Sequence, residues 1–145
     1  MRKLITTTVL FLFFISILSF ILPQDDPWLV PEKYEKMKNP VKADESSIKA
    51  GKSLYNDHCT ACHGKKGKGD GYKAEHINTT PTDFTSPNFQ KQSDGSLLYK
   101  ISYGHKDMPA FKKRIPDNAD VIEGSFGKTR SPGDLINYLR TFAGK

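Results

Sequence analysis

The decisive stretch of the sequence runs Asn56-Asp57-His58-Cys59-Thr60-Ala61-Cys62-His63. It places two cysteines three positions apart and a histidine directly after the second one. The chain of 145 residues has no other cysteine, so a disulfide framework is excluded and local chemistry must explain the pair. At this spacing each thiol can form a thioether to one vinyl group of a haem, with His63 held beneath the iron as an axial ligand.

Two other uses of paired cysteines fit this sequence less well. A thioredoxin-like redox pair needs a βαβ pattern, and no alternating strand pattern occurs here. A zinc site needs four ligands, and a second Cys/His pair with ligand spacing is missing. The motif therefore predicts one haem c and its iron, bound covalently through Cys59 and Cys62.

Met108 is the predicted second axial ligand of that iron. Met1 is the start and Met37 lies in a proline-rich segment, whereas Met108 follows a predicted helix and directly precedes Pro109. A thioether is a soft ligand, and His/Met ligation raises the reduction potential. The strongest rival is His105, three residues away. The other histidines are weaker rivals: His58 and His76.

Three helices are predicted around these ligands, because each begins at a capping residue and carries apolar residues on one face. The first helix delivers Cys59 at its end. Gly51 has no side chain, so the last helix can cross the first one closely at that point. The capping residues are Asp44 or Ser46, then Ser93, then Ser131; the inward residues are Ile48, Leu54 and Tyr55, then Leu97, Leu98 and Ile101, then Leu135, Tyr138, Leu139 and Phe142.

Residues 1–22 have the pattern of an export signal. Arg2 and Lys3 precede an uncharged apolar run, 4–22, which is nearly long enough to cross a bilayer core of about 30 Å as a helix. No A-x-A cleavage site follows, so a retained membrane anchor and a cleaved signal peptide both remain open. Either alternative places the rest of the chain on the extracytoplasmic (periplasmic) side, anchored to the membrane or secreted and soluble.

Residues 23–43 form a second segment, with four prolines and many charges. Prolines break helix and sheet periodicity, so we expect a linker or a strap over the domain surface. Trp28, Leu29 and Val30 are expected either to rest on the domain or to sit at the membrane interface. Residues 44–145 are expected to form one domain.

The charge of the chain limits the kinds of partner that it is expected to bind. The formal net charge is +6, from 22 Lys and Arg against 16 Asp and Glu residues. This modest excess of positive charge favours acidic protein partners or an anionic membrane surface. Nucleic acid is excluded as a partner, because the sequence contains no basic helix and no stripe of aromatic and basic residues. The lysines that flank the ligand motifs are either a docking rim or ordinary solvated surface: Lys65, Lys66, Lys68, Lys106, Lys112 and Lys113.

Four further motifs accompany the Cys59–Gly64 sequence: Gly51-Lys52-Ser53-Leu54-Tyr55, Gly67-Lys68-Gly69-Asp70-Gly71, Met108-Pro109-Ala110-Phe111 and Leu135-Ile136-Asn137-Tyr138-Leu139-Arg140. With them, the stretch from Ser46 to Phe142 resembles a class I cytochrome c domain. The resemblance implies an all-α class I cytochrome c fold, with short helices packed around one covalently bound haem. Here that fold would follow an N-terminal hydrophobic signal or anchor helix.

The resemblance also implies roles for individual residues. Cys59 and Cys62 would form the thioethers, and His63 and Met108 would be the axial ligands. In that family a proline carbonyl accepts the N–H of the axial histidine, and Pro81 is the best match here. Two departures leave the propionate partners open: the segment before the last helix is long, and a tryptophan often found near that helix is missing. The candidates are Tyr103, Lys128 and Arg130.

We therefore expect an electron-transfer protein and not an enzyme, acting by outer-sphere, one-electron transfer in a respiratory or dehydrogenase-linked chain. One alternative is a fixed haem subunit of a larger membrane oxidoreductase complex. Another is a haem enzyme or gas sensor with an open sixth site, for which only His105 and Asp107 offer a distal acid–base pair.

Overall fold

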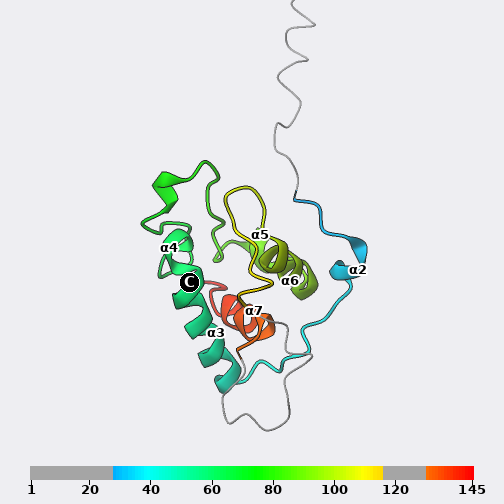
Figure 1. Cartoon of the computed structure of the whole chain (residues 1–145). Coiled ribbons are helices and arrows are strands. Elements are labelled where there is room, and N and C mark those ends of the chain that lie inside the picture. Colours follow the sequence, from blue (N-terminus) through cyan, green and yellow to red (C-terminus); the bar gives the residue numbers. More distant parts are fainter. Residues whose placement is uncertain (1–27, 116–129) are drawn as a thin grey trace, which may run out of the picture.

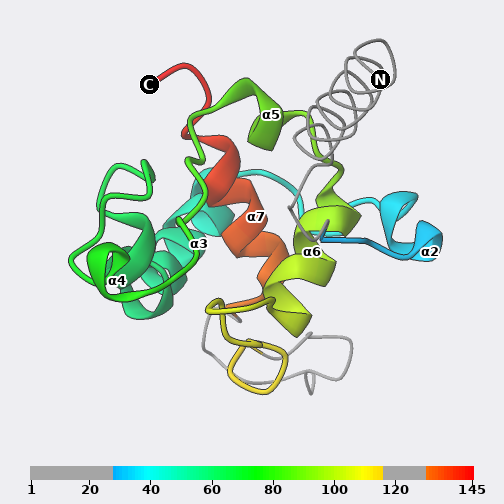
Figure 2. The same ribbon diagram turned by 90° about the horizontal axis from the view of Figure 1, so that it is seen from above.

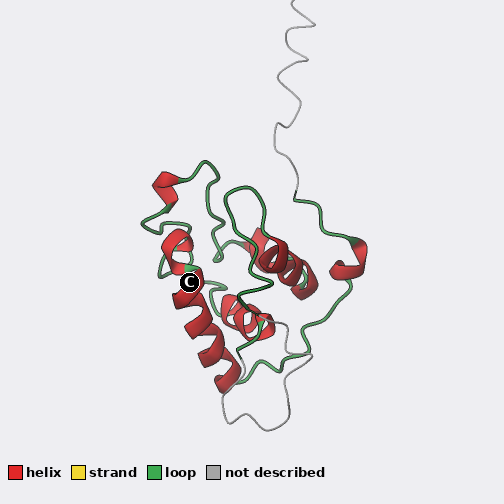
Figure 3. Ribbon diagram, in the orientation of Figure 1, coloured by secondary structure: helices red, strands yellow, loops and turns green. Residues whose placement is uncertain are grey.

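The computed structural model describes residues 28–115 and 130–145. These residues form helices and loops and contain no strand (Figure 3). The helical content agrees with the predicted all-α class. The three longer helices are α3 (Glu45–His58), α6 (Asp94–Tyr103) and α7 (Pro132–Arg140), and the short ones are α2 (Glu32–Glu35), α4 (Thr60–His63), η1 (Ala74–His76) and α5 (Pro87–Gln90).

Each long helix begins at a predicted cap. Of the two candidates for α3, Asp44 is the cap, and its carboxylate accepts a hydrogen bond from the Ser47 N–H at 2.8 Å. Ser93 caps α6 through its hydroxyl. At the start of α7, Ser131 and Asp134 form a reciprocal capping box, with a proline at the first helical position. Local chemistry thus determines where the helices begin.

Helices α3 and α7 cross in direct contact, and α7 lies between α3 and α6 (Figure 2). Gly51 is at the crossing: a Cβ atom added there would meet the Asp134 carbonyl carbon at 2.7 Å and the Tyr138 Cβ at 2.8 Å. The predicted close approach at Gly51 is confirmed. Only a residue without a side chain allows the two backbones this separation.

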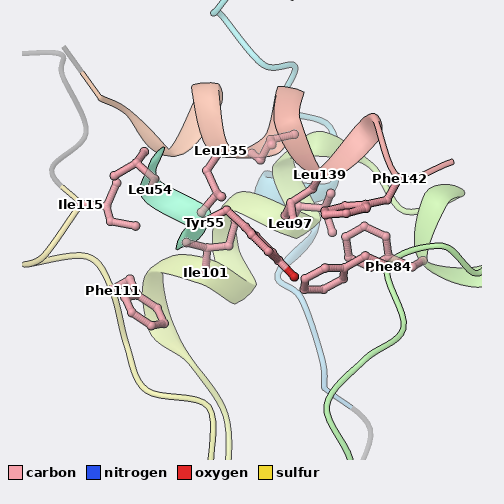
Figure 4. Close-up of a cluster of buried hydrophobic side chains, with 12 residues drawn as sticks. Leu54, Tyr55, Phe84, Leu97, Ile101, Phe111, Ile115, Leu135, Leu139 and Phe142 are labelled. Carbon is pink, nitrogen blue, oxygen red and sulfur yellow. The ribbon is translucent and has the colours of Figure 1, made fainter. Parts of the chain in front are cut away.

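The core lies between these helices and the loops that connect them (Figure 4). Tyr55 is fully buried, and its hydroxyl donates to the Gly64 carbonyl at 2.6 Å.

Ile48, which we predicted to face inward, is only half-buried, because Ser47 occupies the α7-facing position and accepts from Asn137 at 2.8 Å. The buried apolar residues are Leu54, Tyr55, Phe84, Phe89, Leu97, Ile101, Phe111, Ile115, Leu135, Ile136, Leu139 and Phe142; the predicted inward residues Leu98 and Tyr138 are half-buried.

Residues 28–43 lie along the outside of α6 and continue to α7 (Figure 1). Tyr34, on α2, packs its ring on that of Tyr99 at 4.9 Å between centroids. The Asn39 side-chain amide donates to the Gly133 carbonyl and to the Asn137 side chain, both at 2.9 Å. This segment, called the strap below, is therefore held to two helices along its length.

The predicted apolar helix of residues 1–22 lies outside the described residues. So does most of the long segment before α7, residues 116–129, which includes Lys128. Across residues 28–115 and 130–145, every helix is too short or too polar to span a bilayer.

Candidate functional site

The two cysteines lie where α3 passes into α4. Cys59 closes α3, with its N–H bonded to the Tyr55 carbonyl at 2.8 Å, and its own carbonyl accepts the His63 N–H at 2.9 Å. Both thiols are free and half-buried. Burial, with the Cys62 thiol nearby as a smaller cause, raises the pKa of Cys59 to about 12. Cys59 is therefore a neutral thiol at neutral pH.

A glycine-rich loop supports this turn. The N–H groups of Gly69, Gly71 and Lys73 donate to the three consecutive carbonyls of His63, Cys62 and Ala61, at 3.0, 3.0 and 2.8 Å. Gly69 adopts a φ of +79°, a conformation that side-chain-bearing residues rarely take. The loop thus provides hydrogen-bond donors for the last carbonyls of α4, which have no partner within the helix.

The imidazole of His63 is held on two sides. Its Nδ1 lies 3.1 Å from the Thr82 carbonyl oxygen, and its ring stacks on Phe84 at 4.2 Å with an interplanar angle of 20°. Burial lowers the pKa of His63, and the bond to Thr82 partly opposes this effect. A neutral ring that donates from Nδ1 keeps the lone pair of Nε2 for a metal ion.

The acceptor of that bond differs from our prediction. We expected the carbonyl of Pro81, but the bond goes to Thr82, one residue further along. The Pro81 carbonyl instead faces Gly69, where an added Cβ would collide with it. Pro81 still lies in the same segment and lines the cavity that contains the cysteines.

Met108 is presented by a tight turn after α6. His105 and Met108 exchange two backbone hydrogen bonds, both of 2.9 Å, around Lys106, which has a φ of +49°. The Asp107 carboxylate accepts the N–H of Thr79 at 2.8 Å, which ties the turn to the loop after η1. Met108 is half-buried against the core.

One cavity of about 430 Å³ gathers the predicted site residues. Its size falls within the range of small-molecule sites, roughly 300–1,000 Å³. Apolar side chains of α6 and α7, Ile101, Leu135 and Leu139, form part of its wall. The predicted residues that line it are Cys59, Cys62, His63, Pro81 and Met108.

This combination fits a haem. A flat apolar macrocycle needs apolar walls, two thiols for covalent attachment and nitrogen or sulfur donors for the iron, and the cavity lining contains all of these. A larger cavity of about 770 Å³ lies under the strap, but its lining contains no cysteine and no histidine. Within residues 28–115 and 130–145, no group of three or more His, Cys, Asp and Glu side chains is arranged to hold a metal ion by itself.

The rival histidines are placed differently from one another. His76 is exposed in η1 and does not line the cavity. His58 and His105 both line it; His58 lies against Phe111 at 5.8 Å, and His105 stacks on Trp28 at 5.1 Å. His58 and His105 therefore lie in the same cavity wall as His63, and both remain candidates for the second axial ligand.

The propionate candidates lie elsewhere. Arg130 does not line the cavity; it donates to Ser53 at 3.0 Å and to Asp57, a residue of the cavity lining, at 2.7 Å. Tyr103 shares a hydrogen bond of 3.0 Å with Tyr34. The cationic residues that do line the cavity were not predicted, and the sequence held no motif to mark them: Lys73 and Arg114. The six lysines considered for docking are all exposed.

Comparison with known proteins adds a family and a fold. The family model described as "Cytochrome C oxidase, cbb3-type, subunit III" matches residues 46–121, which include the cysteine pair, His63 and Met108. No curated protein matches the chain in sequence. A chain of the reducing HAO-like protein complex of Kuenenia stuttgartiensis has a similar fold, with a TM-score of 0.59 at 23% identity. The match covers 86% of this chain and 54% of that one, so this chain spans about half its length.

Proposed function

The chain belongs to the family described as subunit III of cbb3-type cytochrome c oxidase, a family of c-type cytochrome domains, and from this premise we propose that it is a one-electron carrier with one haem c. Cys59 and Cys62 would hold the haem, and His63 and Met108 would ligate its iron. The observation that carries the proposal is that both thiols, the imidazole and the thioether line one and the same cavity.

The haem, when bound, supplies an iron that changes between the ferric and ferrous states. His63 is prepared for one side of it, because Thr82 and Phe84 fix the ring and keep Nε2 as the acceptor nitrogen. Met108 would provide a soft sulfur donor that favours the ferrous state. Ligands held by the fold need little rearrangement between the two states, which favours rapid electron transfer.

The residues around the cavity support a carrier more than an enzyme. An enzyme with an open sixth site needs a distal acid–base pair. The Asp107 carboxylate accepts the N–H of Thr79, and the His105 ring stacks on Trp28. Both groups serve the structure of the turn, which leaves them poorly placed for proton transfer to a bound substrate.

A fixed subunit of a membrane oxidoreductase complex is the second candidate. The description of the matched family and the complex that contains the structurally similar chain favour it. A fixed subunit would co-purify with its complex after mild detergent extraction, whereas a free shuttle for acidic redox partners would not.

We also propose that residues 1–22 export the domain, as a retained anchor or a cleaved signal, and that residues 44–145 carry the haem on the periplasmic side. The support for export is the pattern of residues 1–22, in which Arg2 and Lys3 precede an uncharged apolar run. N-terminal sequencing of the mature protein would separate the anchor from the signal peptide.

A potentiometric titration of the full chain, matured with haem in an export-competent host, tests the proposal. We expect one wave with the slope of a one-electron couple. Met108→Ala should lower the midpoint potential and let the iron bind carbon monoxide, whereas the exposed Lys113→Ala control should change neither. Identical potentials and carbon monoxide responses in the wild type and Met108→Ala would reject the ligand assignment.

A further inference from the structure

The strap reaches the cavity through one side chain. The indole of Trp28 stacks on the imidazole of His105, with ring centroids 5.1 Å apart and an interplanar angle of 23°. Both rings line the cavity that contains the four proposed haem ligands. A residue of the proline-rich segment, far from the haem-attachment motif in sequence, is therefore part of the cavity wall.

Trp28 is itself fixed in place. The ammonium group of Lys100, on α6, lies 5.3 Å from the centre of the indole, and it donates to the Gln92 side chain at 2.6 Å. Further along the strap, the Tyr34 ring packs on Tyr99. The indole is thus in contact with Lys100 of α6 as well as with the His105 ring.

His105 transmits this restraint to the turn that carries Met108. The two residues share two backbone hydrogen bonds, so the position of His105 and that of Met108 are linked directly. His105 is also a nitrogen donor within the same cavity wall, and its sequence position made it the strongest rival for the iron. The fold therefore needs something that keeps this imidazole away from the iron.

We propose that Trp28 is a positioning residue that holds the His105 imidazole in a stack at the cavity wall and so leaves the sixth position of the iron to Met108. The inference rests on the proposed function, because it concerns the ligand of the same haem. An offset aromatic pair of this kind shifts a conformational equilibrium by about two- to tenfold. A shift of this size measurably changes how a population of haem-loaded molecules divides between two neutral donors of the same cavity wall.

Loss of the stack has a defined chemical consequence. The sulfur of Met108 would leave the iron and an imidazole nitrogen of His105 would take its place. One neutral lone-pair donor replaces another, so neither the charge nor the electron count of the site changes. The midpoint potential falls, because a second nitrogen ligand favours the ferric state more than a thioether does.

The experiment compares variants of the full, haem-loaded chain by the weak red absorption band of ferric iron bound to thioether sulfur. Trp28→Leu keeps apolar bulk but removes the stack, and we expect the band per haem to fall below that of the wild type. Trp28→Phe should retain the band. Leu29→Ala is the matched control, because Leu29 is the next strap residue and is 76% exposed; it should leave the band unchanged.

The double variant Trp28→Leu/His105→Phe identifies the replacing ligand. Without the competing imidazole, Met108 should return to the iron, and the red band and the midpoint potential should recover. An unchanged band in Trp28→Leu, or no recovery in the double variant, would overturn the inference. A wild-type protein that already lacks the band, with no change in Met108→Ala, would instead reject the proposed ligation itself.

Discussion

The α3–α7 crossing and the Met108 turn are built in different ways. At the crossing, the backbone of α7 meets α3 at Gly51, with no side chain between them. The Met108 turn is held by two backbone bonds, one carboxylate and one aromatic stack. The difference suggests that the crossing supplies the stability of the fold, while the turn can be altered to adjust the iron without unfolding the chain.

Gly51→Ala disrupts the α3–α7 crossing and should have the largest effect on the stability of the fold. The new Cβ would meet the Asp134 backbone and the Tyr138 Cβ, which cannot move aside without separating the helices. We expect a loss of at least about 2 kcal/mol in the free energy of unfolding, despite the better helix propensity of alanine. Denaturant unfolding measures it, with the exposed neighbour Lys52→Ala as control. A loss no larger than that of the control would show that the crossing is not tightly packed.

Tyr55→Phe tests the link between the core and the haem-attachment turn. It removes the hydroxyl that donates to the Gly64 carbonyl from a fully buried position. We expect a loss of about 1–2 kcal/mol in the free energy of unfolding. Tyr72→Phe, at a residue 74% exposed, is the matched control and should change stability by less than about 0.5 kcal/mol. Equal effects of the two substitutions would contradict the importance of this hydrogen bond.

Asn39→Ala sharpens the comparison by loosening the strap. It removes the amide bonds to Gly133 and Asn137 and the acceptor for the Val41 N–H. Because the site is only partly buried, we expect a loss of about 1 kcal/mol in the free energy of unfolding. Thermal unfolding measures the change, against the exposed Lys38→Ala. If both variants unfold at the wild-type temperature, the strap contributes nothing to the fold.

The smallest effect is expected at Asp83, beside the segment that holds His63. Hydrogen bonds from the Thr85 hydroxyl and N–H lower the pKa of Asp83. A carboxylate with a lowered folded pKa adds stability above its unfolded pKa, about 3.9, and that stability is lost as the pH falls through the folded pKa. Thr85→Val should therefore raise the pKa of Asp83 toward its usual value and reduce this loss. Carboxyl NMR titration follows the change, and an unaltered titration after Thr85→Val would show that the Thr85 hydroxyl does not lower the pKa of Asp83.

Local chemistry explains what could be predicted from the sequence. The cysteine spacing and the capping residues Asp44, Ser93 and Ser131 act within a few positions of the chain, so a single sequence displays them fully. Gly51 was also predictable, because a glycine between apolar helical positions favours a close crossing. These features account for the helical class and for the grouping of the candidate ligands.

Contacts between distant residues could not be predicted in the same way. The stack of Trp28 on His105 depends on the path of the whole strap, which proline content alone does not define. Arg130 was considered for the propionates, but its guanidinium pairs with Asp57 across the end of α3. The shift from Pro81 to Thr82 depends on the direction of one carbonyl in a loop, which follows from backbone angles that no sequence pattern specifies.

The most direct test of the central claim is the visible spectrum of the haem-loaded full chain, oxidised and then reduced, with and without carbon monoxide. We expect c-type bands that persist after denaturation, the weak red band of ferric iron bound to thioether sulfur, and no response to carbon monoxide. This result would place His63 and Met108 on the iron of one closed site. A missing red band together with ready binding of carbon monoxide would contradict the account, because the sixth position would then be open.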